Sequence, residues 1–334
     1  MVSENISLVV PVRNEEESIE QLIESIGWQT LRPDEVVFVD GGSTDRTVEI
    51  LERFAAGDSK IKLIKTSGAT PGKGRNLGIE AAANDWIALT DAGIRLDDKW
   101  LEELVNVILP PGPSATSPNQ LREPEPGAVI VYGNYTPEIG NLFERCAAIA
   151  YVPSQGASGI RAKFIASSML KKQVWEKVGG FPDMRAAEDL MFMEAAEAAR
   201  FQVAFAPEAM VHWQLRPDVE STFKKFVLYS KHNVWAGRQW DWHYGIARQY
   251  IFLVPFVLLA IFHSWWWLLA IPAWVGARTA KRILAHRYDF ELSALFNPIV
   301  FVGVAGLILV IDAATFVGWA QARESKQNGQ NRKR

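Results

Sequence analysis

The chain has 334 residues, enough for about two domains, and its single cysteine, Cys146, excludes an internal disulfide and a cysteine-based metal cluster. Residues 1–245 hold 25 Lys and Arg against 34 Asp and Glu, an acidic balance that argues against nucleic acid as the main partner. Residues 246–334 hold 10 Lys and Arg against 4 Asp and Glu, and this basic, apolar part indicates a membrane.

The first hundred residues alternate strand patterns with helix patterns. Runs rich in β-branched and apolar residues occupy Ile6–Val12, Val36–Val39, Ile61–Lys65 and Trp86–Leu89. Apolar residues between these runs recur at helical spacing, and the acids of Glu15–Glu17 are expected in a first helical turn. This alternation predicts an α/β fold, a mostly parallel sheet with right-handed crossovers and flanking helices.

Two carboxylates follow predicted strands. Asp40 ends the second run, and Asp91 comes after Thr90 at the end of the fourth. The carboxyl ends of parallel strands share one edge of the sheet, where open α/β sheets bind ligands, so both acids are candidate site residues. A buried carboxylate needs compensation, and for Asp91 a metal ion is a common partner; the alternative is an Asp that simply begins a turn.

The segment Gly68–Asn76 (GATPGKGRN) is rich in glycine and is predicted as a loop. It is not a Walker P-loop, because its glycines are too closely spaced and Gly74 replaces the required Ser or Thr. Two interpretations remain open. The loop wraps a diphosphate through its backbone amides, with Lys73 or Arg75 supplying charge, or it is a flexible turn before the next helix.

Further along the chain, the Pro-rich segment 110–127 is expected to be a surface loop. Glu188 and Asp189 open a helical pattern, where a carboxylate is either a cap or, opposite a sugar-phosphate site, a general base. The helix dipole lowers the pKa of such an acid, while burial beside other acids raises it. His212 lies in a short apolar patch, which is more typical of a structural histidine than of a metal ligand.

These segments together resemble glycosyltransferase family 2, the inverting enzymes with the GT-A fold. The matching pieces lie in the family's order between residue 6 and about residue 215, at Val9–Glu15, Val39–Asp45, Gly74–Ile79, Thr90–Gly93, Gly179–Phe181 and Glu188–Asp189. The resemblance implies a Rossmann-like sheet and a nucleotide-diphosphate sugar donor, with UDP-sugar expected from the family. The residues that it implies for donor binding are Pro11, Val12, Asn14, Glu15, Asp40, Gly42, Gly74, Arg75, Asn76, Asp91 and Ala92.

The resemblance also implies a metal and a mechanism. Asp91 matches the first acid of the family's D-x-D motif, and Gly93 stands where the second acid belongs. One carboxylate, two diphosphate oxygens and waters can surround Mg²⁺ or Mn²⁺, and His212 resembles a late histidine ligand of some members. In the implied single displacement Asp189, beside Glu188, takes the proton of an acceptor hydroxyl, so the configuration inverts. No Q-x-x-R-W motif of processive synthases follows, so transfer of one sugar per encounter is expected.

The remaining chain predicts membrane association beyond a catalytic domain at residues 1–218. Residues 219–245 are expected to form an amphipathic interfacial segment, and 246–320 a transmembrane region with apolar blocks at 250–277 and 292–320, followed by a basic tail at 321–334. Each block exceeds one span and falls short of two, so the number of spans stays open. Asp312 is the one acid inside a block, which indicates contact with another helix or with an acceptor channel.

The expected function follows from both parts of the chain. It is transfer of one sugar to a hydroxyl of a lipid or lipid-linked acceptor. Because Met1–Leu8 is polar, no signal peptide is expected, and the protein is expected in the inner (plasma) membrane as a multi-pass protein with a cytoplasmic catalytic domain. A polyprenyl-phosphate acceptor is one alternative, and a catalytically silent sugar-nucleotide-binding membrane protein is another. The enzyme hypothesis requires Asp40, Asp91 and Asp189 to converge on one pocket.

Overall fold

The structure, a computed structural model, describes residues 5–108 and 127–331, with side chains up to residue 323. Most of the predicted loop at 110–127 therefore lies outside the described residues, as do residues 332–334 of the basic tail and the side chains of residues 324–331. The chain divides into two compact units. Unit 1 comprises residues 1–137 and 160–214, and unit 2 comprises residues 138–159 and 215–334.

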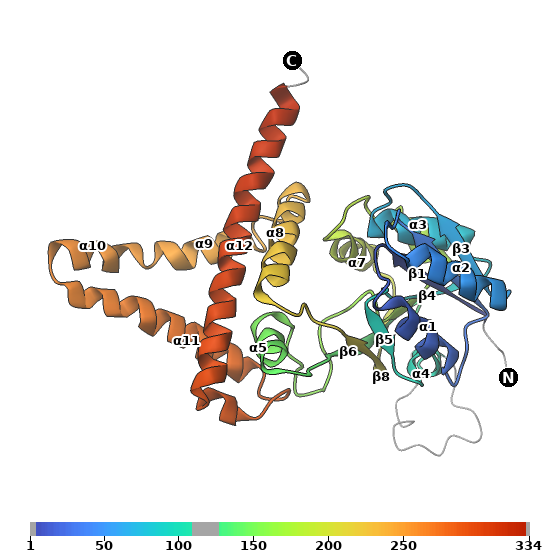
Figure 1. Cartoon of the computed structure of the whole chain (residues 1–334), viewed down its shortest axis with the longest axis horizontal. Helices are drawn as coiled ribbons and strands as arrows, with labels where there is room; N and C mark the ends of the chain where they lie inside the picture. Colours follow the sequence, from blue (N-terminus) through green and yellow to red (C-terminus); the bar gives the residue numbers. More distant parts are fainter. Residues whose placement is uncertain (1–4, 109–126, 332–334) are drawn as a thin grey trace. The chain divides into compact units, whose positions relative to one another are not determined.

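Unit 1 is built on one mixed sheet, which has eight strands in the described residues (Figure 1). The strand order is β3-β2-β1-β4-β7-β6-β8-β5. The strands are β1 (Ile6–Val12), β2 (Glu35–Asp40), β3 (Ile61–Lys65), β4 (Trp86–Leu89), β5 (Ile94–Leu96), β6 (Ile130–Pro137), β7 (Ser168–Lys171) and β8 (Val203–Trp213). β1 to β4 pair in parallel, whereas β7 is antiparallel to β4 and β6, and β5 to β8.

The predicted α/β sheet is confirmed, and its parallel half is the part that the sequence pattern describes. Every residue of β2 and β4 is buried, as expected for apolar strands covered by helices on both faces of a parallel sheet. β3 alternates between half-buried and exposed residues, which fits its place at the edge of the sheet. The later strands join the sheet by long-range pairing, antiparallel for β7 and β5 and parallel between β6 and β8, which no local sequence pattern predicts.

Six helices accompany this sheet in the described part of unit 1. They are α1 (Ile19–Gly27), α2 (Thr47–Gly57), α3 (Pro71–Ala81), α4 (Trp100–Asn106), α6 (Lys172–Val178) and α7 (Glu188–Ala198). Two expectations are wrong here. The acids Glu15–Glu17 precede α1 instead of forming its first turn. The segment Gly72–Asn76 is helical, because α3 starts at Pro71 with Thr70 as its cap, whose side chain accepts a hydrogen bond from the Lys73 amide.

The glycines of α3 allow the helix to pack closely on its neighbours. A Cβ on Gly78 would lie 2.3 Å from Val9 Cγ1 of β1, and one on Gly72 would lie 2.1 Å from the Pro182 carbonyl oxygen. A Cβ on Gly74 would lie 3.1 Å from the Pro11 Cβ. Close packing therefore accounts for these glycines better than the flexibility of a loop does, and it fixes Arg75 between two of them.

Unit 2 is helical. Its elements are α5 (Leu142–Tyr151), α8 (Val219–Trp235), α9 (His243–Ile251), α10 (Val254–Phe262), the 3₁₀ helix η2 (Trp265–Leu269), α11 (Ala270–Ala285), the 3₁₀ helix η3 (Leu292–Leu295) and α12 (Pro298–Asn331). The long α12 packs along α8 and α5, while α9 and α10 run outward and α11 returns (Figure 1). The apolar block predicted at 250–277 is thus a helical hairpin.

Two segments of unit 2 are long and apolar enough to cross a membrane, judged by length and composition alone. They are His243–Phe262, of which 6% is buried, and Pro298–Arg323, of which 39% is buried. Unit 2 also contains α5, which comes from the interval 138–159 between two stretches of unit 1. The predicted domain at residues 1–218 lacked this interruption, because the sequence of α5 shows no change of composition that would mark it.

Candidate active site

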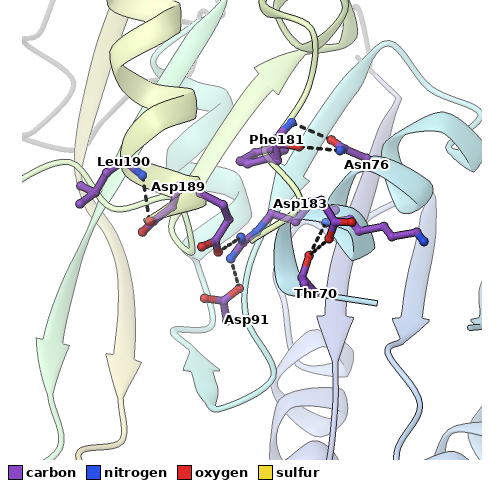
Figure 2. A network of polar contacts seen from close by, with 10 residues as sticks. Thr70, Asn76, Asp91, Phe181, Asp183, Asp189 and Leu190 are labelled. Atoms are coloured by element: carbon purple, nitrogen blue, oxygen red, sulfur yellow. Dashed lines mark hydrogen bonds and ion pairs between the residues drawn. The ribbon is translucent and has the colours of Figure 1, made fainter. Parts of the chain in front are cut away.

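Arg75 of α3 connects two acids that are far apart in the sequence, one of which, Asp91, is labelled in Figure 2. Its guanidinium is buried, with Nη1 2.8 Å from Glu188 Oε1 and Nη2 2.6 Å from Asp91 Oδ1. Asp91 follows β4, and Glu188 is the first residue of α7. The side chain of Glu188 is buried, whereas that of Asp91 is 38% exposed. The structure thus brings the end of a central strand and the start of a helix together around one cation.

The charges in this cluster shift one another's pKa. Burial raises the pKa of Glu188, and the charge of Asp189 raises it further, against the opposing effect of Arg75. Burial also raises the pKa of Asp189, with a further contribution from Asp91, although Arg75 and the Leu190 amide oppose the shift. For Arg75, the three carboxylates outweigh burial and raise its pKa. Burial beside other acids therefore prevails over the helix N-terminus at both carboxyls.

The start of α7 is held in an unusual backbone conformation. Ala187, immediately before the helix, has φ +70°, a left-handed conformation that side chains other than glycine rarely adopt. Asp189 Oδ1 accepts a hydrogen bond of 2.8 Å from the Leu190 amide (Figure 2). Backbone strain of this kind is concentrated at functional sites, and here it fixes the two acids at the first turn.

Three buried polar atoms of this region have no hydrogen-bond partner among the described residues. They are Arg75 Nε, Thr90 Oγ1 and Glu188 Oε2. Buried polar atoms in native proteins are almost always paired, so three such atoms on side chains at or next to one ion-pair cluster indicate polar groups that arrive with a ligand or water.

Asp40 lies on the same edge of the sheet but is not part of the cluster around Arg75. It ends β2, is buried, and accepts hydrogen bonds from the amides of Gly42 (3.0 Å) and Ser43 (3.1 Å). β1 lies between β2 and β4, so two strand spacings, about 10 Å, separate the ends that carry Asp40 and Asp91. Of the three acids expected to converge, Asp91 and Asp189 meet around Arg75, and Asp40 lies to one side.

The chain after β1 is tied to the chain after β2. Asn14, at φ +55°, donates its amide to Ser43 Oγ at 2.9 Å, and its Oδ1 accepts from the Thr44 amide at 2.8 Å. The Glu15 amide donates to Thr47 Oγ1 at 2.8 Å. Gly42, at φ +86°, lies so close to the next loop that a Cβ would approach the Gly68 nitrogen to 3.0 Å. These contacts form a continuous edge that also carries Pro11, Val12 and Ala92.

Asn76 has a structural role that the sequence did not indicate. Its Oδ1 accepts a hydrogen bond from the Phe181 amide and its Nδ2 donates one to the Phe181 carbonyl, both at 2.8 Å (Figure 2). The same Oδ1 also accepts a hydrogen bond of 2.8 Å from Trp175 Nε1. Phe181 in turn stacks on Phe192 of α7 with ring centroids 4.0 Å apart. Asn76 thus anchors the turn that leads into α7. The glycine pair before Phe181 was the one available signal, since Gly180 has φ +79°.

The expected metal ligands are not gathered in the structure. His212, on β8, has its Nε2 3.9 Å from Asp97 Oδ2 and pairs along the sheet with Arg95 of β5. In the part of the chain that the structure describes, no three His, Cys, Asp or Glu side chains are grouped to hold a metal ion. Asp91 offers one half-exposed carboxylate, which fits Mg²⁺ or Mn²⁺ when a diphosphate and waters supply the other oxygens.

The chain is similar in sequence to known glycosyltransferases. Residues 7–161 match the family model described as "Glycosyl transferase family 2". The uncharacterized glycosyltransferase EpsJ of Bacillus subtilis is 37% identical over 86 residues, 26% of this chain and 25% of that protein. The glycosyltransferase AglE of Haloferax volcanii is 27% identical over 231 residues, 66% of this chain and 70% of that protein.

A solved structure supports the fold. The mannosyltransferase PcManGT from Pyrobaculum calidifontis, in complex with GDP-Man and Mn²⁺, superposes with a TM-score of 0.54 at 16% identity, covering 94% of this chain and 88% of that one. The chain spans only a quarter to under half of the first curated relatives it matches. The family match assigns residues 7–161, just under half of the chain, to glycosyltransferase family 2, and the solved structure supports the fold alone.

Proposed function

We propose that the chain transfers a sugar from a nucleotide-diphosphate sugar to an acceptor hydroxyl. The observation that carries this proposal is the cluster in which Arg75 pairs with Asp91 and Glu188 beside Asp189. A displacement reaction needs one group that acts on the leaving group and one that acts on the nucleophile. In this proposal Asp91, half-exposed at the end of a strand, acts on the leaving group, and Asp189, whose pKa is raised at the start of α7, acts on the nucleophile.

The donor is assigned to the edge formed by the ends of β1, β2 and β4. The residues assigned to it are Pro11, Val12, Asn14, Glu15, Asp40, Gly42, Gly74, Arg75, Asn76, Asp91 and Ala92. Asn14 and Asp40 shape the turn that would receive the nucleoside, because their side chains hold the backbone of residues 42–44. Asn76 acts in this proposal by positioning the turn before α7. Uridine remains a family expectation, and the PcManGT complex contains GDP-Man.

Asp91 is the residue that would hold a divalent cation, Mg²⁺ or Mn²⁺. When bound, the cation supplies charge to the departing diphosphate. The Mn²⁺ in the PcManGT complex supports this assignment. Gly93 occupies the position of the missing second acid of the D-x-D motif. A Cβ on Gly93 would lie 3.9 Å from Glu15 Oε2, so another carboxylate lies near this position. His212 remains a weaker candidate, since its neighbour across 3.9 Å is Asp97.

Asp189 is assigned as the general base. Its raised pKa makes it a stronger base than an ordinary aspartate, and it removes the proton of the acceptor hydroxyl as the oxygen attacks the anomeric carbon. A single in-line attack inverts the configuration, and one sugar is transferred per encounter. Glu188, paired through Oε1 with Arg75 and buried, is assigned as a positioning residue that holds the guanidinium.

We further propose that unit 2 associates with a membrane and that the acceptor is a lipid or is linked to one. The support is the exposure of large apolar side chains on α10 and the following turn, including Phe262 at 83% and Ile261 at 68%. Residues 219–245 fit an interfacial segment, because α8 is helical and carries Lys224 and Lys225 beside apolar residues. A multi-pass arrangement in the inner membrane with a cytoplasmic unit 1 remains a prediction.

The function is tested with a panel of nucleotide sugars, Mn²⁺ or Mg²⁺, and acceptors that present either a hydroxyl or a phosphate. Asp189→Asn should reduce transfer to a hydroxyl by roughly 10²–10⁴-fold. The matched control is Glu197→Gln on the exposed face of the same helix, which should leave the rate unchanged. A rate that survives Asp189→Asn with a phosphate acceptor would favour the polyprenyl-phosphate alternative. Donor binding without turnover on any acceptor would favour a silent binding protein.

A further inference from the structure

Unit 2 contains a charged cavity that the proposed transfer reaction does not use. The cavity has a volume of about 320 Å³ and is lined by residues of α5, α9, α11 and α12. Three of its lining residues are cations of α11, Arg278, Lys281 and Arg282, and one is an acid of α12, Asp312. Cations therefore outnumber acids three to one on the walls of this cavity.

The single acid is fully engaged by one of the three cations. Asp312 is buried, and its two carboxylate oxygens lie 2.5 Å and 3.2 Å from the two terminal nitrogens of Arg278. The Tyr250 hydroxyl donates a further hydrogen bond of 2.7 Å to the same carboxylate. This pair is geometrically complete, so Asp312 neutralises Arg278 and fixes its position.

The other two cations have no carboxylate partner in the described residues. Arg282 donates Nε to the carbonyl oxygens of Ile149 (3.1 Å) and Ala150 (3.0 Å), which are neutral groups. Burial lowers the pKa of Arg282, because its charge is removed from water without a counter-ion. Lys281 is exposed at the rim. A partly buried cation without a counter-ion is costly, and an anionic ligand would remove that cost.

The surroundings of the cavity favour an anion carried by a lipid over a free anion. α9 and α10 expose apolar side chains such as Ile251, Phe252 and Val254. A second cavity of about 750 Å³ lies in the same unit, with almost wholly apolar walls that include Phe143 and Val302 from α5 and α12. Because α9 also lines the cationic cavity, its exposed apolar side chains match a molecule with a charged head and a hydrocarbon chain.

We propose that the cavity lined by Arg278, Lys281 and Arg282 binds the phosphate group of a membrane lipid. Lys281 and Arg282 contact the phosphate, and Asp312 acts as a positioning residue through Arg278. Such a lipid would be the carrier or the neighbour of the sugar acceptor, so this proposal deepens the proposed function. It rests on the proposed function only for what happens to the lipid after it has bound. Binding itself involves no sugar donor.

The test measures binding of the purified full chain to phosphatidylcholine vesicles with and without phosphatidic acid. Phosphatidic acid should strengthen binding, and Lys281→Gln should weaken that gain roughly five-fold, as expected for one cation at an anionic surface. Arg282→Gln should weaken the gain from phosphatidic acid at least as much. A thermal melt of this variant checks that it is folded. The matched control is Lys177→Gln at the end of α6 in unit 1, which removes the same charge from an exposed site outside unit 2.

Several results would overturn the inference. One is an equal gain from phosphatidic acid in wild type and Lys281→Gln, and another is an equal loss in Lys177→Gln. A third is tight binding of inorganic phosphate or glycerol phosphate that releases the protein from the vesicles, since this would assign the cavity to a free phosphate. Because no nucleotide sugar is present, failure here leaves the transfer reaction untouched, and loss of transfer leaves lipid binding untouched.

Discussion

Arg75 is the residue on which the candidate site depends most. Its guanidinium is buried and pairs with Glu188, which is also buried, and with the half-exposed Asp91. A buried ion pair contributes little net stability, because removing both charges from water offsets their attraction. Removing one partner is different, since the other charge then remains in the interior without compensation.

Arg75→Met should therefore destabilise the protein by roughly 3–5 kcal/mol and abolish transfer. The measurement is urea unfolding, with Arg53→Met as the control. Arg53 pairs with Glu20 where both side chains are more than half exposed, so its loss should cost less than about 1 kcal/mol. The double variant Arg75→Met/Glu188→Gln should recover part of the lost stability, because it leaves no buried charge at position 188. Equal effects of Arg75→Met and Arg53→Met would contradict the burial argument.

The raised pKa of Asp189 predicts how the rate depends on pH. The base acts only when it is deprotonated, so kcat/KM should fall as the pH falls through that raised pKa. The acid limb of the profile should thus lie above the usual range of an aspartate. A limb at ordinary aspartate pH would show that the carboxyl is not shifted in the free enzyme.

The raised pKa of Asp189 and Glu188 also affects the pH dependence of stability, and in the opposite direction to an acid whose pKa is lowered by folding. A folded-state pKa above the unfolded value means that folding favours the protonated carboxyl. The stabilising contribution of Glu188 and Asp189 is complete below their unfolded pKa and is lost as the pH rises through the folded value. Asp189→Asn should reduce the dependence of the free energy of unfolding on pH without lowering the melting temperature at neutral pH. Glu197→Gln should leave this pH dependence as in wild type.

The sequence indicates single candidate residues where a local pattern marks their place. Asp91 follows an apolar run and Asp189 opens a helical pattern, and the structure places them near one cation. The pairing of Arg75 with Glu188 joins residues 113 positions apart, so no local pattern contains it. Asn76 was assigned from a motif, and its three hydrogen bonds to Phe181 and Trp175 depend on a turn that only tertiary structure brings near.

At the scale of elements, the glycines of α3 explain why a loop was predicted where the structure has a helix. Glycine and proline usually interrupt helices, so Gly68–Asn76 indicated a loop. The structure starts a helix within it, because Pro71 suits the first turn and the missing side chains permit close contact with β1. By contrast, the bounds predicted for Ile6–Val12, Ile61–Lys65 and Trp86–Leu89 are those of β1, β3 and β4, since each strand coincides with a run of β-branched and apolar residues.

Gly78→Ala should destabilise unit 1 by about 1–3 kcal/mol, because the new methyl group would overlap Val9 in a packed core. The control is Gly57→Ala in α2, where nothing lies within 4 Å of the added Cβ. That substitution should leave stability unchanged or raise it, since alanine favours a helix over glycine. Chemical denaturation of both variants provides the comparison, and a tolerated Gly78→Ala would show that α3 can move away from the sheet.

At the scale of the whole molecule, composition predicted an apolar second part but not how it is folded. The block at 250–277 suggested a spanning segment, and the structure divides it among α9, α10, η2 and α11. Proline at positions 255 and 272 permits these breaks, but the direction of each helix depends on packing against α12 and α5. The interval 138–159 was assigned to the catalytic domain, because α5 resembles any amphipathic helix until its partners are known.

The exposed tip of α10 should anchor the protein to membranes. Phe262→Ser should lower the fraction that floats with phosphatidylcholine vesicles by roughly ten-fold, since burying one phenylalanine contributes about 1.5–3 kcal/mol. Trp28→Ser, which removes an aromatic residue of comparable exposure from unit 1, should leave flotation unchanged. An equal loss in both variants would indicate non-specific adhesion through any exposed ring.

The path of the chain between the units limits how the protein can be divided into fragments. The polypeptide leaves unit 1 after Pro137, builds α5 in unit 2, returns at Ile160 and leaves again after Gln214. A fragment that stops at Gln214 would still carry α5, but it would strip away α12, whose backbone carbonyl at Val300 accepts a hydrogen bond from the Cys146 thiol. Helix α5 would then present its apolar side to solvent, so a fragment that ends at Gln214 should aggregate. A soluble form of unit 1 would require removal of residues 138–159 as well.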